Sequence, residues 1–235
     1  GGDFTDLGTR IARLNADGTN DATFATNIGT GFNNTVRTIK IVNGGKILVG
    51  GDFTMFNESP RQKIALLNSD GTLDTGFSPA SVLTSSVYAV AMQADGKVLA
   101  GRPGASTTLL YRFNSNGTED TSFNNGLILG TPTFIRAIHT NSTDDIIVGG
   151  WFEQGLVRAA YSNGAIADIT AGNGIEGTVP EVNDLVVLSD GSIILGGTFT
   201  SYNGILVDNL VKVATCTVSI DQEPESTQVC EGEDA

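Results

Sequence analysis

One stretch of this chain reads Gly45-Lys46-Ile47-Leu48-Val49-Gly50-Gly51-Asp52-Phe53-Thr54, and shorter copies of it return along the sequence. The copies are Gly1-Gly2-Asp3-Phe4-Thr5, Ala100-Gly101-Arg102, Gly149-Gly150-Trp151-Phe152 and Gly196-Gly197-Thr198-Phe199-Thr200. Their aligned glycines stand at positions 2, 51, 101, 150 and 197. A repeat with a period of about fifty residues is one supersecondary unit that stacks on its neighbours.

Each unit also contains two further apolar runs. In the second unit they are Val36-Arg37-Thr38-Ile39-Lys40-Ile41 before the quoted stretch and Ile64-Ala65-Leu66-Leu67-Asn68 after it. Runs of this length, rich in Val, Ile and Leu, are typical of strands. Asn43-Gly44 and Asp70-Gly71 favour tight turns, because Gly and Asn tolerate positive φ. No stretch has apolar residues at helical spacing over three turns, so we expect no helix.

These features predict an all-β protein, a β-propeller of four-stranded blades with about fifty residues each. About five blades or part-blades are present, counted on the glycines, and we expect residues 1–214 to be an excerpt of a larger ring. The paired glycines would end the second strand where neighbouring backbones crowd or the chain kinks. The Phe after them, such as Phe53, would pack between blades.

The repeat resembles the delta-60 repeat, a β-propeller repeat of large secreted bacterial proteins. The resemblance rests on the quoted stretch, on Asp95-Gly96-Lys97-Val98-Leu99, on Ile11 to Gly18 and on Asp70 to Phe77. The third unit departs from the pattern, because Arg102-Pro103-Gly104 replaces Gly-Asp-Phe, and the fourth has Trp151 in place of Asp. That family has no agreed catalytic residues, so the resemblance implies a non-catalytic secreted protein and a substrate of type 9 secretion.

Residues 215–235 differ in composition from the repeats. They hold both cysteines, Cys216 and Cys230, and carry acids but no Lys or Arg. Val218 to Pro224 and Gln228 to Glu233 resemble the first strands of an immunoglobulin-like domain. A solvated acidic linker explains the same composition equally well. Cys216 and Cys230 could form a disulfide in an oxidising compartment.

The net charge limits the partners of the chain. It holds 13 Lys and Arg against 26 Asp and Glu, a net charge of −13. A surface that follows phosphates needs clustered Lys and Arg, so we expect no nucleic acid partner. No apolar run reaches the length of a membrane span, so we also expect no membrane insertion.

Repeated acids near the third turn of each unit are candidate calcium ligands. They lie four residues apart at Asp17 and Asp21, at Asp70 and Asp74, and at Asn116 and Asp120. Calcium takes six to eight oxygen ligands, and two acids with nearby carbonyls would begin such a site. In the favoured alternative, the first residue forms the turn and the second caps the next turn through hydrogen bonds to the backbone. We expect no other cofactor.

Trp151, Glu153 and Tyr202 are the candidate ligand-binding residues. The aromatic rings could stack on a sugar, and Glu153 is the acid nearest to an apolar context. The alternative is core packing, because Phe53 occupies the same repeat position as Phe152, which follows Trp151. His139 is the only histidine, and no Gly-x-Ser-x-Gly accompanies it.

We therefore expect a non-catalytic binding or scaffold module, extracellular or at the cell surface, in a large multidomain protein such as a bacterial adhesin. Its partners would be other domains of the same chain and a surface glycan or protein. One alternative is a structural subunit of an extracellular or virion appendage. A less favoured alternative is a propeller glycan hydrolase or lyase.

Overall fold

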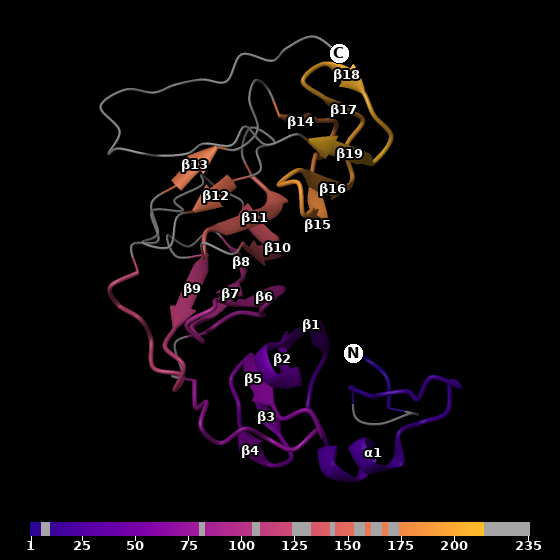
Figure 1. Cartoon of the computed structure of the whole chain (residues 1–235), viewed down its shortest axis with the longest axis vertical. Coiled ribbons are helices and arrows are strands. Elements are labelled where there is room, and N and C mark those ends of the chain that lie inside the picture. Colours follow the sequence, from indigo (N-terminus) through magenta and orange to yellow (C-terminus); the bar gives the residue numbers. More distant parts are fainter. Residues whose placement is uncertain are drawn as a thin grey trace.

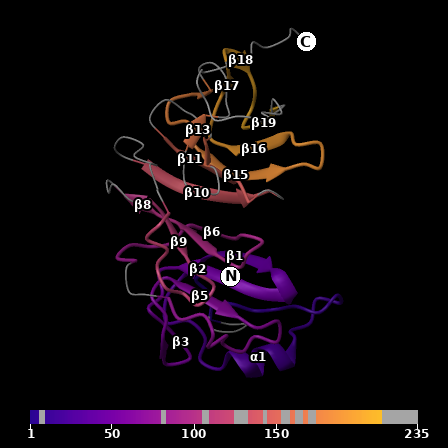
Figure 2. The same ribbon diagram turned by 60° about the vertical axis from the view of Figure 1, so that its left-hand side comes forward.

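The computed structural model describes residues 1–5, 10–79, 83–104, 109–123, 133–141, 144–152, 158–160, 166–168 and 174–213. Its strands form small antiparallel sheets that stack in chain order along the long axis of the molecule (Figure 1). Helix α1 lies at one end of the stack and β18 at the other, in both views (Figure 2). The predicted all-β propeller architecture is confirmed. The tail with Cys216 and Cys230 lies outside the described residues.

Each repeat from the second to the fifth forms one antiparallel sheet. The second unit contains β1 (Val36–Val42), β2 (Lys46–Gly51) and β5 (Ile64–Leu67), and the third contains β6 (Ala89–Met92), β7 (Val98–Gly101) and β9 (Leu110–Phe113). The fourth contains β10 (Thr133–Thr140), β11 (Ile146–Trp151), β12 (Arg158–Ala160) and β13 (Ile166–Asp168), and β8 (Pro103–Gly104) joins its edge. The fifth contains β15 (Val182–Val187), β16 (Ile193–Gly197) and β19 (Leu210–Val213).

Short elements connect these sheets. A 3-10 turn, η1 (Asn43–Gly45), joins β1 to β2. β3 (Met55–Phe56) pairs with β4 (Ser59–Pro60), and β17 (Ser201–Tyr202) pairs with both β14 (Ile175–Glu176) and β18 (Ile205–Leu206). None of the helices in the described ranges has the length and apolar character to cross a membrane.

The fourth strand of a blade is complete only in the fourth unit, among the residues that the structure describes. Single bridges replace it in the first three units, at Leu14–Asn20, Leu67–Leu73 and Phe113–Glu119. In the second and third units the chain turns away after the bridge, where a carboxylate accepts a hydrogen bond from the backbone two residues on. Gly76 N donates to Asp74 at 2.8 Å, and Ser122 N donates to Asp120 at 3.1 Å. Blades two and three therefore have three strands and a bridge.

Helix α1 (Ala22–Ile28) departs from the expectation of no helix. Asp21 caps it by accepting a hydrogen bond from Phe24 N at 3.0 Å, and Gly29 ends it at φ 53°. With seven residues, the helix is too short to show helical periodicity over three turns. It buries Phe24 and Ile28 against the second unit.

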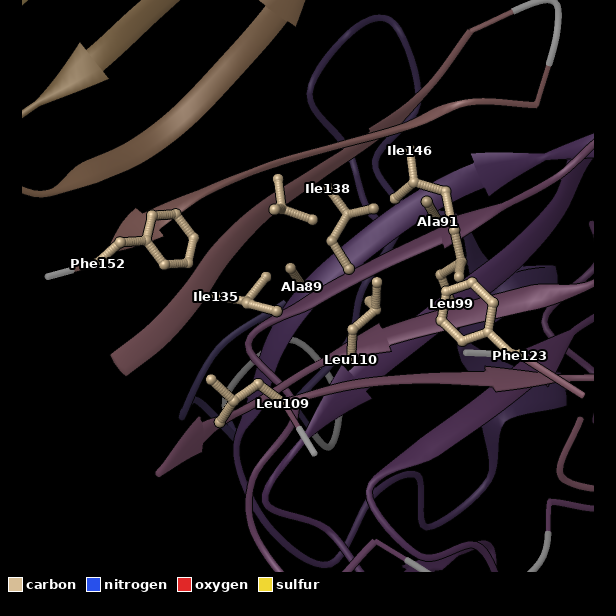
Figure 3. Packing of buried hydrophobic residues seen from close by; sticks show 11 residues of the cluster. Ala89, Ala91, Leu99, Leu109, Leu110, Phe123, Ile135, Ile138, Ile146 and Phe152 are labelled. Carbon is tan, nitrogen blue, oxygen red and sulfur yellow. The ribbon is translucent and has the colours of Figure 1, made fainter. Parts of the chain in front are cut away.

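In the part of the chain that the structure describes, buried side chains form four clusters, one between each pair of consecutive units. Ile47 and Val49 pack toward the first unit, whereas Leu48 between them packs toward the third. Successive side chains of a strand point to opposite faces, so each sheet contributes to two interfaces. Figure 3 shows the interface where Leu99 and Leu110 of the third unit pack with residues of the fourth. The expected burial of Phe53 between blades is confirmed.

The first glycine of each pair faces the next unit. A Cβ atom on Gly50 would lie 2.7 Å from Val87 Cγ1 and 2.9 Å from Val90 Cγ1. The next first strand can therefore approach only because this side chain is absent. Equivalent contacts occur at Gly1 with Val36 and Ile39, at Gly101 with Ile135 and Ile138, and at Gly149 with Val182 and Leu185. The first glycine therefore meets side chains of the next unit, and the predicted crowding of backbones occurs only at the second glycine.

The second glycine faces the first strand of its own unit. A Cβ atom on Gly51 would overlap the carbonyl oxygen of Thr35. The register of β1 and β2 shifts there between Val36 and Thr38, which leaves Arg37 as the extra residue of a bulge. The same overlap and shift recur at Gly150 with Phe134 and at Gly197 with Glu181.

The third unit is offset by one residue from the sequence alignment above. Gly101 makes the contacts of a first glycine, so Arg102 and not Gly101 holds the second position. The carbonyl of Arg102 accepts a hydrogen bond from Ile135 N at 3.4 Å, as that of Gly51 does from Val87 N at 3.1 Å. The alignment of residue 101 with the second glycines was therefore wrong by one.

This offset has a local cause. Asp52 N donates to the Thr35 carbonyl at 2.9 Å and closes the bulge of the second unit. Pro103 stands at the equivalent position of the third unit and has no N–H. The β6–β7 ladder runs from Met92–Val98 to Ala89–Gly101 and includes no pair at Arg102. The second position of this unit carries a side chain, that of Arg102.

Candidate binding surface along the first strands

The first strands β1, β6, β10 and β15 lie on the same side of the stack (Figure 1). Arg37, Tyr88 and Arg136 occupy equivalent positions near the starts of three of these strands. Each directly follows the residue that packs against the first glycine of the preceding unit. With Phe134 and Trp151 they form a set that we call the arginine–aromatic strip.

The strip is continuous across three units. The Arg37 Cζ atom lies 4.5 Å from the ring centroid of Tyr88, and the Arg136 Cζ atom lies 4.9 Å from the same centroid. Arg136 also lies 5.6 Å from the Phe134 centroid. Phe134 stacks with Trp151 at 5.7 Å and an interplanar angle of 14°. Tyr88 of the third unit is thus contacted by guanidinium groups from the second and the fourth.

Carboxylates fix both arginines. Arg37 Nε and Nη2 donate to the two oxygens of Asp52 at 2.7 and 2.6 Å, a bidentate pair. The hydrogen bond from Arg37 lowers the pKa of Asp52. Arg136 Nε donates a single hydrogen bond to Glu181 Oε1. Both arginine side chains remain about one third exposed, 34% and 35%. The strip therefore offers ordered, charge-compensated guanidinium and aromatic groups to solvent.

The structure places the predicted ligand-binding residues apart. Trp151 is partly buried and belongs to the strip through its stack on Phe134. Tyr202 is half-buried in the fifth unit, packed beside the cluster that contains Phe199, and burial raises its pKa. Glu153 lies outside the described residues. Arg37, Tyr88 and Arg136 were missed, although their shared repeat position was visible in the sequence.

The first residue of each candidate calcium pair forms the turn that it begins. Thr19 N donates to Asp17 at 3.0 Å, Thr72 N donates to Asp70 at 2.9 Å, and Thr118 N donates to Asn116 at 3.0 Å. The glycine after each has φ between 83° and 93°. Side-chain hydrogen bonds from Thr19 and Thr72 lower the pKa of Asp17 and of Asp70.

The second residue of each pair accepts hydrogen bonds from a cationic side chain and from the backbone. Asp21 bonds to Arg13 at 2.8 Å, and Asp74 bonds to Lys46 at 2.6 Å. Asp120 bonds to Arg112 at 2.9 Å. Burial raises the pKa of Asp120, but hydrogen bonds from the Ser122 and Lys97 side chains and the nearby positive charges outweigh it and hold the pKa at about 2. Within the described ranges, no three His, Cys, Asp or Glu side chains gather to hold a metal ion. Calcium binding stays a prediction.

Comparison with known proteins agrees with this architecture. A family described as "Domain of unknown function (DUF5122) beta-propeller" matches residues 1–24, 45–77, 93–123 and 188–215. These segments cover the quoted stretch and its neighbours in four of the five units. No curated protein sequence matches the chain. The chain is therefore a β-propeller repeat protein.

Solved structures show the same fold at low sequence identity. The WD40 propeller domain of Doa1 is 19% identical with a TM-score of 0.52, over 77% of this chain and 51% of that one. PorZ, a surface component of the type-IX secretion system of Porphyromonas gingivalis, is 12% identical with a TM-score of 0.53, over 87% and 29%. An extracellular domain from B. thetaiotaomicron, of a protein described as a hybrid two-component system, is 14% identical with a TM-score of 0.50, over 83% and 23%. This chain thus spans about half or less of each.

Proposed function

We propose that this chain is a non-catalytic binding and scaffold module of a large secreted or cell-surface protein, such as a bacterial adhesin. The arginine–aromatic strip is the observation that carries the proposal. Tyr, Trp and Arg are the side chains most enriched at binding hot spots. Here they lie together across three units, with Arg37, Tyr88 and Arg136 at repeat-equivalent positions. A protein or glycan partner would lie across Tyr88 and Trp151.

The charge states of the acids favour a non-catalytic role. A general acid that works near neutral pH needs a carboxyl group with a raised pKa. Among the described carboxylates with a resolved shift, every pKa is lowered, because each accepts hydrogen bonds from hydroxyl, backbone or cationic groups. They are Asp17, Asp21, Asp52, Asp70, Asp74, Asp120 and Asp190. These carboxylates stay ionised and act as structural acceptors.

The extracellular setting rests on the sequence resemblance. The repeat resembles delta-60 repeats of secreted bacterial proteins, and residues 215–235 resemble the start of an immunoglobulin-like domain. Both features fit a multidomain surface protein exported by type 9 secretion. Two proteins that share the fold are themselves described as a surface component and an extracellular domain.

The test is binding of the chain to immobilised glycans and extracellular matrix proteins. The variants Tyr88→Ala and Trp151→Ala should weaken binding by about thirtyfold, because hot-spot truncations cost about 2 kcal/mol. Tyr202→Ala removes a half-buried tyrosine outside the strip and is the matched control. Melting curves would verify that each variant is folded. Equal binding by all four proteins, or no binding to any probe, would refute the proposal.

A further inference from the structure

A second feature lies outside the strip, at the side chain of Arg102. This residue is 7% exposed. Its Nη1 atom donates to Thr84 Oγ1 at 3.3 Å, and its Cζ atom lies 5.5 Å from the ring centroid of Tyr111. Its Nε atom is buried and has no hydrogen-bond partner. No residue in the described ranges accepts a hydrogen bond from Nη2 or forms an ion pair with this guanidinium.

The other arginines of the described part behave differently. Five of them pair with an acid: Arg10 with Asp3, Arg13 with Asp21, Arg37 with Asp52, Arg112 with Asp120 and Arg136 with Glu181. Arg61 also has a buried Nε atom without a partner, but it donates to the Pro60 carbonyl and the residue as a whole is only partly buried. A buried charge without a counter-ion is costly, and proteins normally pair it. Arg102 is as deeply buried as Arg112, at 7% exposed, but has no acid partner among the described residues.

The geometry of Arg37 shows what Arg102 lacks. Arg37 uses its Nε–Nη2 edge to hold both oxygens of Asp52. The Nε atom on the same edge of Arg102 has no hydrogen-bond partner, and the third unit has Pro103 where the second has Asp52. Ser85, next to Thr84 in the chain, also has a buried Oγ atom without a partner. Thr84, which accepts the hydrogen bond from Arg102, is exposed.

We propose that Arg102 binds a small oxyanion, a carboxylate or a sulfate, through its Nε–Nη2 edge, with Ser85 Oγ as a further donor. The planar fork of a guanidinium matches two oxygens of such a group, and charge-assisted hydrogen bonds of this kind are strong. In the second unit, Asp52 supplies the negative charge that pairs with an arginine. The bound anion would supply the negative charge for Arg102 in the third unit. This inference does not rest on the proposed function, since Arg102 lies outside the strip.

Thermal unfolding tests the site with sodium sulfate, sodium acetate and sodium chloride at one ionic strength. We expect sulfate or acetate to raise Tm by about 5 °C or more with saturation, relative to chloride, because a ligand at 100 times its Kd stabilises by about 2.7 kcal/mol. Arg102→Met should abolish the rise. Arg61→Met, which also removes a guanidinium without an acid partner, should keep it.

The outcomes separate the sources of the oxyanion. A rise with sulfate alone assigns an inorganic anion, and a rise with acetate assigns a carboxylate, such as that of an acidic side chain or sugar. If Arg102→Met fails to fold, Arg102→Lys keeps the charge but loses the fork, and it should lower the apparent affinity for the anion at least tenfold. No anion-specific rise in the wild type, or the same rise in the Arg102 variants, would overturn the proposal.

Discussion

Gly51→Ala should destabilise this protein far more than a single added methyl group normally does. The new Cβ atom would overlap the Thr35 carbonyl oxygen, which already accepts a hydrogen bond from Asp52 N at 2.9 Å. Both partners of the overlap are backbone, so no side-chain rotation relieves it. Overpacking costs about 1–3 kcal/mol, and loss of the hydrogen bond adds about 1 kcal/mol. The smaller entropy of the unfolded Ala chain returns about 0.4–1 kcal/mol.

The net loss is therefore about 1–3.6 kcal/mol, or a fall in Tm of about 2–14 °C for a chain of this size. Gly196→Ala is the matched control, because Gly196 holds the first-glycine position of the fifth unit. Its nearest neighbour would be Leu210 Cδ1 at 3.9 Å, an ordinary contact. That variant should be neutral, or more stable by about 0.5–1 kcal/mol.

Circular dichroism during heating and during urea unfolding would measure both variants. The urea slope should be unchanged, since the folded structure is the same and only its stability differs. If Gly51→Ala unfolds at the same temperature and urea concentration as Gly196→Ala, the bulge does not require glycine and the reasoning fails.

Three further predictions follow from the packing and the ion pairs. Asp120→Asn removes a carboxylate from the buried Arg112 and should cost about 3 kcal/mol at pH 7. Because the folded pKa of about 2 lies below the ordinary value of 3.8, this stability is present above pH 4 and is lost toward pH 2. The acid limb of Tm against pH should therefore be shallower in the variant, and parallel curves would contradict this. Leu110→Ala should cost about 2–5 kcal/mol in urea unfolding, whereas Leu210→Ala at the equivalent position should cost little, because the side chains are 0% and 63% exposed. Addition of calcium or of EDTA should leave Tm unchanged, since the repeated turn acids already accept hydrogen bonds. A saturable rise in Tm with calcium would instead support the candidate calcium site.

Much of the fold could be predicted because its signals are local. Strand alternation and Asp-Gly turns act over a few residues, and their return after about fifty residues specifies stacked units. Asp70 illustrates this, because its turn requires only Gly71 at φ 93° and the hydrogen bond from Thr72. Helix α1 escaped prediction, since one cap at Asp21 sufficed to start seven residues of helix without a repeating pattern.

The candidate site could not be predicted in the same way. Trp151 was visible as an aromatic after paired glycines, but Arg37, Tyr88 and Arg136 are separated by about fifty residues each. Only the stacking of sheets places both guanidinium groups within 5 Å of the Tyr88 ring centroid. Each belongs to an alternating run that by itself indicates a strand and nothing about partners.

The sequence by itself determined the class of fold, the number of repeats and the position of the turns, because each depends on residues close together in the chain. The tertiary structure alone decided which glycine meets the next blade, why Arg102 takes a glycine position beside Pro103, and where Arg102 lacks an acid. Those outcomes depend on the register between strands and on the distance between blades, which are set by packing across units and leave no local pattern in the chain.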